Sequence, residues 1–189
     1  FWILDDLAPL HELTTDVASA RAHLFTPRNA YRAGWQQSED AGYVRDAIGA
    51  ARLKSSYAGQ NPPAGAMIFY ALGESPERVT LDILDRRGQA IRSFSSDGDD
   101  GEKLTTEHGM NRFVWDLSYP GVQGAAGGGF GGGPGPGPRA VPGTYQAQLT
   151  VDGRSETRSF QVLKDPRIST TEAEFQEQFD LLIDIRDRL

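Results

Sequence analysis

The chain has 189 residues, a net charge of −7, no cysteine, and 22 glycines and 11 prolines. The negative charge argues against nucleic acid or an anionic membrane surface as the main partner. The lack of cysteine excludes disulfide bonds and thiolate chemistry. No stretch of about 18 apolar residues is present, so we expect no membrane span. The glycine and proline content predicts turns and loops rather than a helical bundle.

Residues 1–32 show only short, mixed patterns. An apolar strand, Phe1–Leu4, opens the chain, and Asp5 and Asp6 after it are interpreted as a solvated turn. Further on, Thr15 or Asp16 can cap a short helical turn, and residues 22–25 can form a strand. Because the sequence opens in a strand and stops in a helix, we expect it to be a piece of a longer protein.

Residues 33–63 are predicted to be an extended linker, since small and polar residues dominate and periodicity is poor. Asn61-Pro62-Pro63 closes this linker, because proline sterics hold the backbone extended. Trp35, Tyr43 and Tyr57 lie in the linker as aromatic anchors for a neighbouring domain or a ligand.

Residues 64–168 predict an Ig-like or FnIII-like antiparallel β-sandwich of six or seven strands. In the best-defined strand, Tyr145, Ala147, Leu149 and Val151 alternate with polar residues, so one face is buried. Asp152-Gly153 then predicts a type I′ hairpin turn. The strands are expected at residues 66–72, 79–84, 90–95, 112–117, 144–151 and 154–163.

A Gly/Pro-rich tract at residues 124–138 interrupts the sandwich. It lacks the Gly-Lys-Ser/Thr of a phosphate-binding loop and the three-residue period of collagen. We therefore predict a flexible loop, with Phe130 as its single aromatic residue. Residues 169–189 follow as an amphipathic helix, introduced by the capping box Thr171-x-x-Glu174 and expected to be the first half of a helical hairpin.

Few residues indicate ligand chemistry. An acidic turn provides oxygen atoms of the kind that calcium prefers, but its spacing differs from an EF-hand, so it is only a weak calcium candidate. The histidines, His11, His23 and His108, are scattered, and we predict no metal site, no cofactor and no catalytic residue. Trp115 and Phe113 are interpreted as core residues rather than a sugar-stacking platform. The acidic turn consists of Asp97, Asp99, Asp100 and Glu102.

Several ordered motifs resemble the C-terminal region of large bacterial BNR/Asp-box β-propeller proteins, which are labelled sortilin-like or glycosyl-hydrolase-like. The middle of the chain also resembles the Ig-like domain of flagellar hook-capping proteins. The motifs are FWILDDLxPL from residue 1, AHLFxPRxAYR from residue 22, GQNPP from residue 59, GMNRFxWDL from residue 109, VPGTY from residue 141 and DPR from residue 165.

The resemblance implies that residues 1–32 end the last propeller blade and leave it, that a sandwich follows, and that residues 169–189 begin a helical pair. It also implies export to the periplasm or the exterior. The family's ligand-binding residues would lie in the propeller, so none is carried over. At residues 124–138 relatives tend to have a longer loop with bulky apolar residues, so this chain departs from the pattern there.

Two functions remain open at this point. The first is a non-catalytic accessory region that packs on and stabilises its own upstream propeller, with homo-oligomer formation through the C-terminal helix as a further role. The second is a carbohydrate- or protein-binding module of a sialidase-like glycosidase parent, with aromatic side chains as stacking surfaces. Whether the parent is an enzyme stays open. The candidate binding residues are Trp35, Tyr43, Tyr57 and Phe130.

Overall fold

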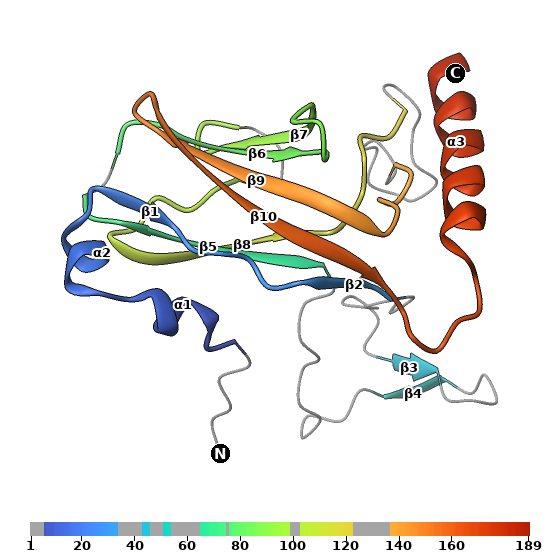
Figure 1. Cartoon of the computed structure of the whole chain (residues 1–189), viewed down its shortest axis with the longest axis horizontal. Helices are drawn as coiled ribbons and strands as arrows, with labels where there is room; N and C mark the ends of the chain where they lie inside the picture. Colours follow the sequence, from blue (N-terminus) through green and yellow to red (C-terminus); the bar gives the residue numbers. More distant parts are fainter. Residues whose placement is uncertain are drawn as a thin grey trace.

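The computed structural model describes residues 6–33, 65–74, 76–98, 103–122 and 137–189, together with the backbone of residues 43–45 and 51–53. Two β-sheets form two layers, with a long helix beside one end of them (Figure 1). The prediction of a mainly β protein with a C-terminal helix is confirmed.

The smaller sheet has three antiparallel strands in the order β1-β5-β8. β5 is strictly alternating, with Ala66, Ile68, Tyr70 and Leu72 buried and the residues between them half-buried. This is the pattern of a strand with one face on the core. The bounds are β1 Ala22–Leu24, β5 Ala66–Leu72 and β8 Gly109–Trp115.

The larger sheet has five strands in the order β2-β10-β9-β6-β7, antiparallel except for β2, which runs parallel to β10. The turn between β9 and β10 has φ 46° at Asp152 and 82° at Gly153, as the type I′ prediction requires. The bounds are β2 Ala30–Arg32, β6 Val79–Leu84, β7 Ala90–Ser95, β9 Gly143–Val151 and β10 Arg154–Lys164.

The core lies between the two sheets. Trp115 is fully buried, and its ring centroid lies 5.5 Å from that of Tyr145 and 6.2 Å from that of Phe160. Its indole Nε1 donates to the carbonyl of Ser118 at 3.1 Å, so the polar atom of this large side chain is satisfied. The core interpretation of Trp115 is therefore confirmed.

Four local predictions differ from the structure. β8 spans 109–115 rather than 112–117, because Leu117 has φ 64°, a left-handed conformation that ends the strand. Thr14, rather than Thr15 or Asp16, caps α2 (Thr15–Ser19) by accepting the amide of Val17. Within the predicted linker, β3 (Tyr43–Arg45) pairs antiparallel with β4 (Ala51–Leu53). The predicted sandwich began at residue 64, whereas β1 and β2 supply edge strands from residues 22–32.

The end of the glycine tract is held in place. Pro138 accepts a hydrogen bond from the amide of Tyr119 at 2.8 Å, and Arg139 bridges to Ser118. The flexible-loop prediction for residues 124–136 lies outside the described residues, as does the predicted strand Phe1–Leu4. Of the helices in the described ranges, none has the length and apolar character to cross a bilayer.

The helix α3 (Glu172–Arg188) begins with the predicted capping box: Thr171 accepts the amide of Glu174, whose carboxylate accepts the amide of Thr171. Phe175 is buried against the sandwich, and the ring of Phe179 lies 4.8 Å from that of Tyr119. Further along, Leu181 is exposed, so the apolar stripe of α3 is only partly covered.

The turn that leads into α3 gives a pH-dependent prediction. Hydrogen bonds from the side chain and then the backbone of Arg167 lower the pKa of Asp165 from 3.8 to about 2. A lowered folded-state pKa stabilises the protein above the ordinary pKa, and this stabilisation is lost as the pH falls from about 4 to 2. In Arg167→Ala we expect NMR titration to give a pKa of the Asp165 carboxyl closer to 3.8. Arg154→Ala is the control and should leave this pKa unchanged. An unshifted midpoint in Arg167→Ala would contradict this.

Candidate docking surface

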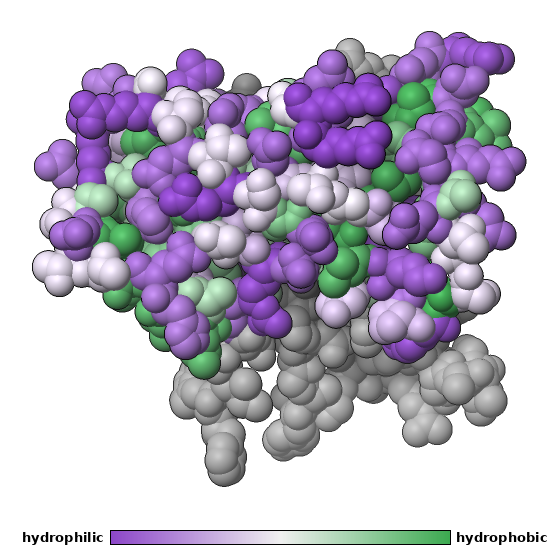
Figure 2. Space-filling model, viewed as in Figure 1, coloured by the Kyte–Doolittle hydropathy of each residue, from purple (hydrophilic) through white to green (hydrophobic). Residues whose placement is uncertain are grey.

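Three leucines of the N-terminal segment are exposed. Leu7, Leu10 and Leu13 keep 50, 50 and 47% of their surface in solvent. Leu7 precedes α1 (Ala8–Glu12), Leu10 lies within it and Leu13 follows it. The spacing of three places Leu7 and Leu10 on one side of this short helix. Figure 2 shows hydrophobic side chains in this region, at the lower left. We call these three residues the leucine surface.

Asp6 anchors the start of this segment. Its side chain is 4% exposed, accepts the amide of Ala8 at 2.9 Å, and lies 3.9 Å from Nη1 of Arg28. Pro9, in the first turn of α1, is also buried. The interpretation of Asp6 as part of a solvated turn is therefore wrong. Its carboxylate is buried, accepts the amide of the first residue of α1, and pairs with Arg28.

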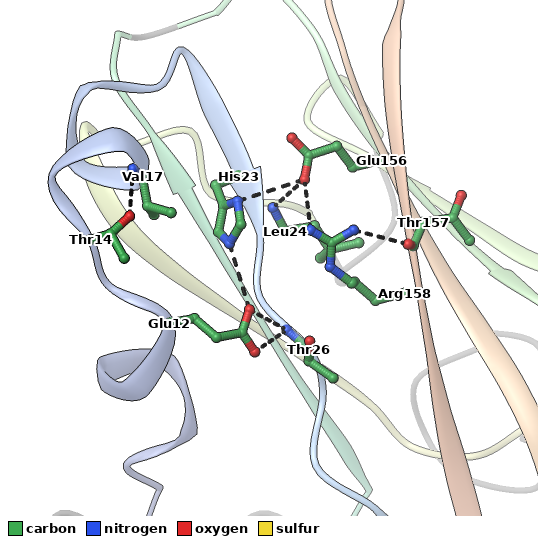
Figure 3. Close-up of polar contacts among 9 residues, drawn as sticks. All are labelled: Glu12, Thr14, Val17, His23, Leu24, Thr26, Glu156, Thr157 and Arg158. Carbon is green, nitrogen blue, oxygen red and sulfur yellow. Dashed lines mark hydrogen bonds and ion pairs between the residues drawn. The ribbon is translucent and has the colours of Figure 1, made fainter.

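Glu12 and His23 anchor the end of α1 (Figure 3). The carboxylate of Glu12 accepts the amide of Thr26 at 3.1 and 3.3 Å through its two oxygens. Its Oε2 also lies 3.7 Å from Nε2 of His23, whose side chain is only 16% exposed. The ring of His23 packs edge-on against Phe25, at 4.8 Å between centroids.

A second carboxylate reaches the same imidazole from the other sheet. Oε2 of Glu156, on β10, lies 3.8 Å from Nδ1 of His23 and accepts the amide of Leu24 at 3.1 Å (Figure 3). Arg158 Nη2 lies 3.6 Å from the same oxygen. One side chain of the larger sheet thus holds β1, the edge strand of the smaller sheet.

Glu12, His23 and Glu156, which we call the clamp, hold α1 in place rather than form a metal site. The two carboxylates face opposite nitrogens of one ring, so they do not converge on a single cation. Both carboxylates are also engaged by backbone amides. Within the described part of the chain, no group of three or more His, Asp or Glu is placed to hold a metal ion. Glu12, His23 and Glu156 together fix α1 and the leucine surface against the sandwich.

The clamp predicts a local effect of mutating Glu12. In Glu12→Ala the amide of Thr26 loses its acceptor, and we expect the N-terminal segment to open more easily by about 1 kcal/mol. Hydrogen exchange at residues 8–19 should accelerate about fivefold, while exchange in β9 stays unchanged. Asp16→Asn, in the same segment, is the control and should behave as the wild type. Equal exchange in the two variants would contradict the clamp.

The structure tests few of the sequence-predicted site residues. Tyr43 begins β3, where only the backbone is described. Asp97 is described, and its carboxylate lies 3.6 Å from Nε of Arg78 and accepts a hydrogen bond from Ser96 Oγ at 3.4 Å. The remaining candidates lie outside the described residues: Trp35, Tyr57, Asp99, Asp100, Glu102 and Phe130.

Neither the leucine surface nor its clamp was predicted from the sequence. The spacing of Leu7, Leu10 and Leu13 was a usable signal for a short amphipathic helix. By contrast, Glu156 lies 132 residues from Leu24 along the chain, and no local pattern connects them. No protein-family model, curated protein or solved structure matches this chain.

Proposed function

We propose that this chain is a non-catalytic accessory module of a larger exported protein, and that it packs through the leucine surface on a β-propeller that precedes it. The observation that carries this proposal is the combination of exposed leucines and a clamp that holds them in one position. A preorganised apolar surface loses little conformational entropy when a partner covers it.

The propeller as partner rests on the resemblance of FWILDDLxPL at residues 1–10 to the end of a propeller in BNR/Asp-box proteins. Leu7 and Leu10 belong to that motif, so the same residues that carry the resemblance also form the exposed surface. Covering a leucine that is half exposed contributes about 1 kcal/mol. Three such residues support an interface between domains of one chain, where the effective concentration is high.

An Ig-like or FnIII-like sandwich is the form that we propose for the module. If the strands β1, β5, β6, β7, β8, β9 and β10 are named A, B, C, C′, E, F and G, the smaller sheet is A-B-E. The larger sheet is G-F-C-C′, with β2 as an additional edge strand beside G. This is an order of Ig-related sandwiches. In addition, the hydroxyl of Tyr145 donates to the carbonyl of Val141 at 2.8 Å, as in a tyrosine corner. The buried Trp115 departs from immunoglobulins, because it lies on the fifth of these strands.

The test uses the full-length polypeptide that contains this chain. In Leu7→Asp/Leu10→Asp, we expect the propeller to unfold at a lower temperature in calorimetry, because two charges enter the interface. The matched control is Leu181→Asp/Leu189→Asp, which alters two exposed leucines near the C-terminus of the chain and should leave the propeller transition unchanged.

Two outcomes would overturn the proposal. One is an upstream sequence without repeated Ser-x-Asp-x-Gly boxes. The other is a propeller transition that the Leu7/Leu10 variant does not move. A glycan array separates the rival function: the accessory module should give no signal, whereas saturable binding of one glycan class would favour the carbohydrate-binding module.

A further inference from the structure

A cleft of about 390 Å³ lies between α3 and the end of β2. Its volume is within the range of small-molecule sites, about 300–1,000 Å³. The cleft lies away from the leucine surface, because its walls come from α3, from Arg32 and from residues 121–122 and 137–139. Binding in this cleft therefore does not depend on the proposed docking.

Positive charge is concentrated in this cleft. Arg32, Arg139 and Arg186 line it, and no acidic side chain is among its lining residues in the described part of the chain. Arg186 is paired with Asp187, at 2.6 Å between Nη2 and Oδ1. Among the residues that the structure describes, Arg32 and Arg139 contact only uncharged groups, so no described carboxylate neutralises these two charges.

The contacts of Arg32 leave one part of its guanidinium available. The group lies 4.3 Å from the ring centroid of Phe175, and Nη2 donates to Oε1 of Gln178 at 3.2 Å. Nη1 is buried and has no hydrogen-bond partner among the described residues. A buried N–H of a charged group without an acceptor is costly, so an anion placed there would be stabilised.

Arg139 adds a second donor group to the same space. Its Nη1 donates to the carbonyl of Ala33 at 3.1 Å, which orients the side chain without neutralising it. Burial, and then the charge of Arg139, lower the pKa of Arg32. The two guanidinium groups therefore repel each other, and a bound anion would relieve that repulsion.

Apolar side chains line the cleft beside the arginines. Leu182 and Ile185 of α3 are 39 and 47% exposed, and Val122 and Pro138 also belong to the lining. Figure 2 shows hydrophobic side chains over α3 at the upper right. An apolar wall beside two arginines fits a ligand with an anionic head and a hydrophobic body.

We propose that this cleft binds an amphipathic carboxylate, with its carboxylate at Arg32 and Arg139 and its apolar part against Leu182 and Ile185. A monoanion matches the chemistry, since arginine pairs well with planar carboxylates. A free organic acid and the C-terminal carboxylate of a polypeptide share this chemistry.

Binding is tested on the 189-residue chain by NMR titration of arginine Nε–H signals with 3-phenylpropionate. Saturable shifts at Arg32 and Arg139 are expected. The uncharged 3-phenylpropan-1-ol and the short propionate should each bind at least about tenfold more weakly, because each lacks one of the two contacts. N-acetyl-alanyl-phenylalanine distinguishes the sources: if it binds more tightly than 3-phenylpropionate, a polypeptide C-terminus is the ligand, and otherwise a free acid is.

Variants locate the site. Arg32→Gln should weaken 3-phenylpropionate binding at least about tenfold, and Arg139→Gln should do the same if Arg32→Gln fails to fold. Arg188→Gln, on α3 but outside the cleft, is the control and should keep wild-type affinity. The proposal is overturned by the absence of saturable binding up to the solubility limit, by equal binding of the alcohol, or by wild-type affinity in a folded arginine variant of the cleft.

Discussion

Replacing Trp115 by alanine is expected to lower the free energy of unfolding by about 3–5 kcal/mol. The side chain is fully buried and packs against Tyr145 and Phe160, which belong to the opposite sheet. Its removal leaves a cavity between the sheets and takes away the donor to the Ser118 carbonyl. Urea denaturation measures the loss as a lower midpoint at similar slope.

Met110→Ala is the matched control for this measurement. Met110 lies on the same strand, β8, but is 45% exposed. A surface substitution of this kind should change stability by less than about 1 kcal/mol. If the two variants lost similar stability, Trp115 would not be the centre of the inter-sheet core, and the two-layer packing described here would be incorrect.

Gly73→Ala is expected to destabilise the protein by about 1–3 kcal/mol, because the chain passes too close for a methyl group. A Cβ on Gly73 would lie 2.5 Å from the carbonyl oxygen of Ala20, a backbone atom that cannot move alone. The amide of Gly73 also donates to the carbonyl of Arg21 at 2.9 Å. Hydrogen exchange in β1 should accelerate more than exchange in β9.

Gly98→Ala provides the comparison. Its added Cβ would lie 3.5 Å from the nearest atom, the carbonyl oxygen of Ser95, which is an ordinary contact. Stability should then remain within about 0.5 kcal/mol of the wild type. If Gly73→Ala did not change stability, residues 20–21 would not pack on the sandwich in solution. The segment that carries the leucine surface would then not be fixed against the sandwich.

Local sequence patterns were sufficient to predict the structure where the conformation depends on neighbouring residues. The predicted bounds of β5, β6 and β7 match the structure, because alternation of apolar and polar residues has a period of two in any strand with one buried face. The capping box at Thr171 and the turn at Asp152-Gly153 were also confirmed, since each depends on residues at most three apart.

Short elements were harder to predict. α1 and β2 are five and three residues long, too short for a period to emerge from the sequence. The pairing of β2 with β10 joins Ala30 to Val162. Such a contact is stabilised by the whole sheet, and neither strand alone carries a signal for it.

The sequence by itself determined the alternating strands of the sandwich, the hairpin turn and the start of the last helix, because these depend on the backbone preferences and polarity of adjacent residues. Only the tertiary structure decided which side chains meet: Glu156 with His23, and Arg32 with Arg139 at a separation of more than 100 residues. Contacts of this kind follow from how the two sheets and α3 pack, which is a cooperative property of the whole fold.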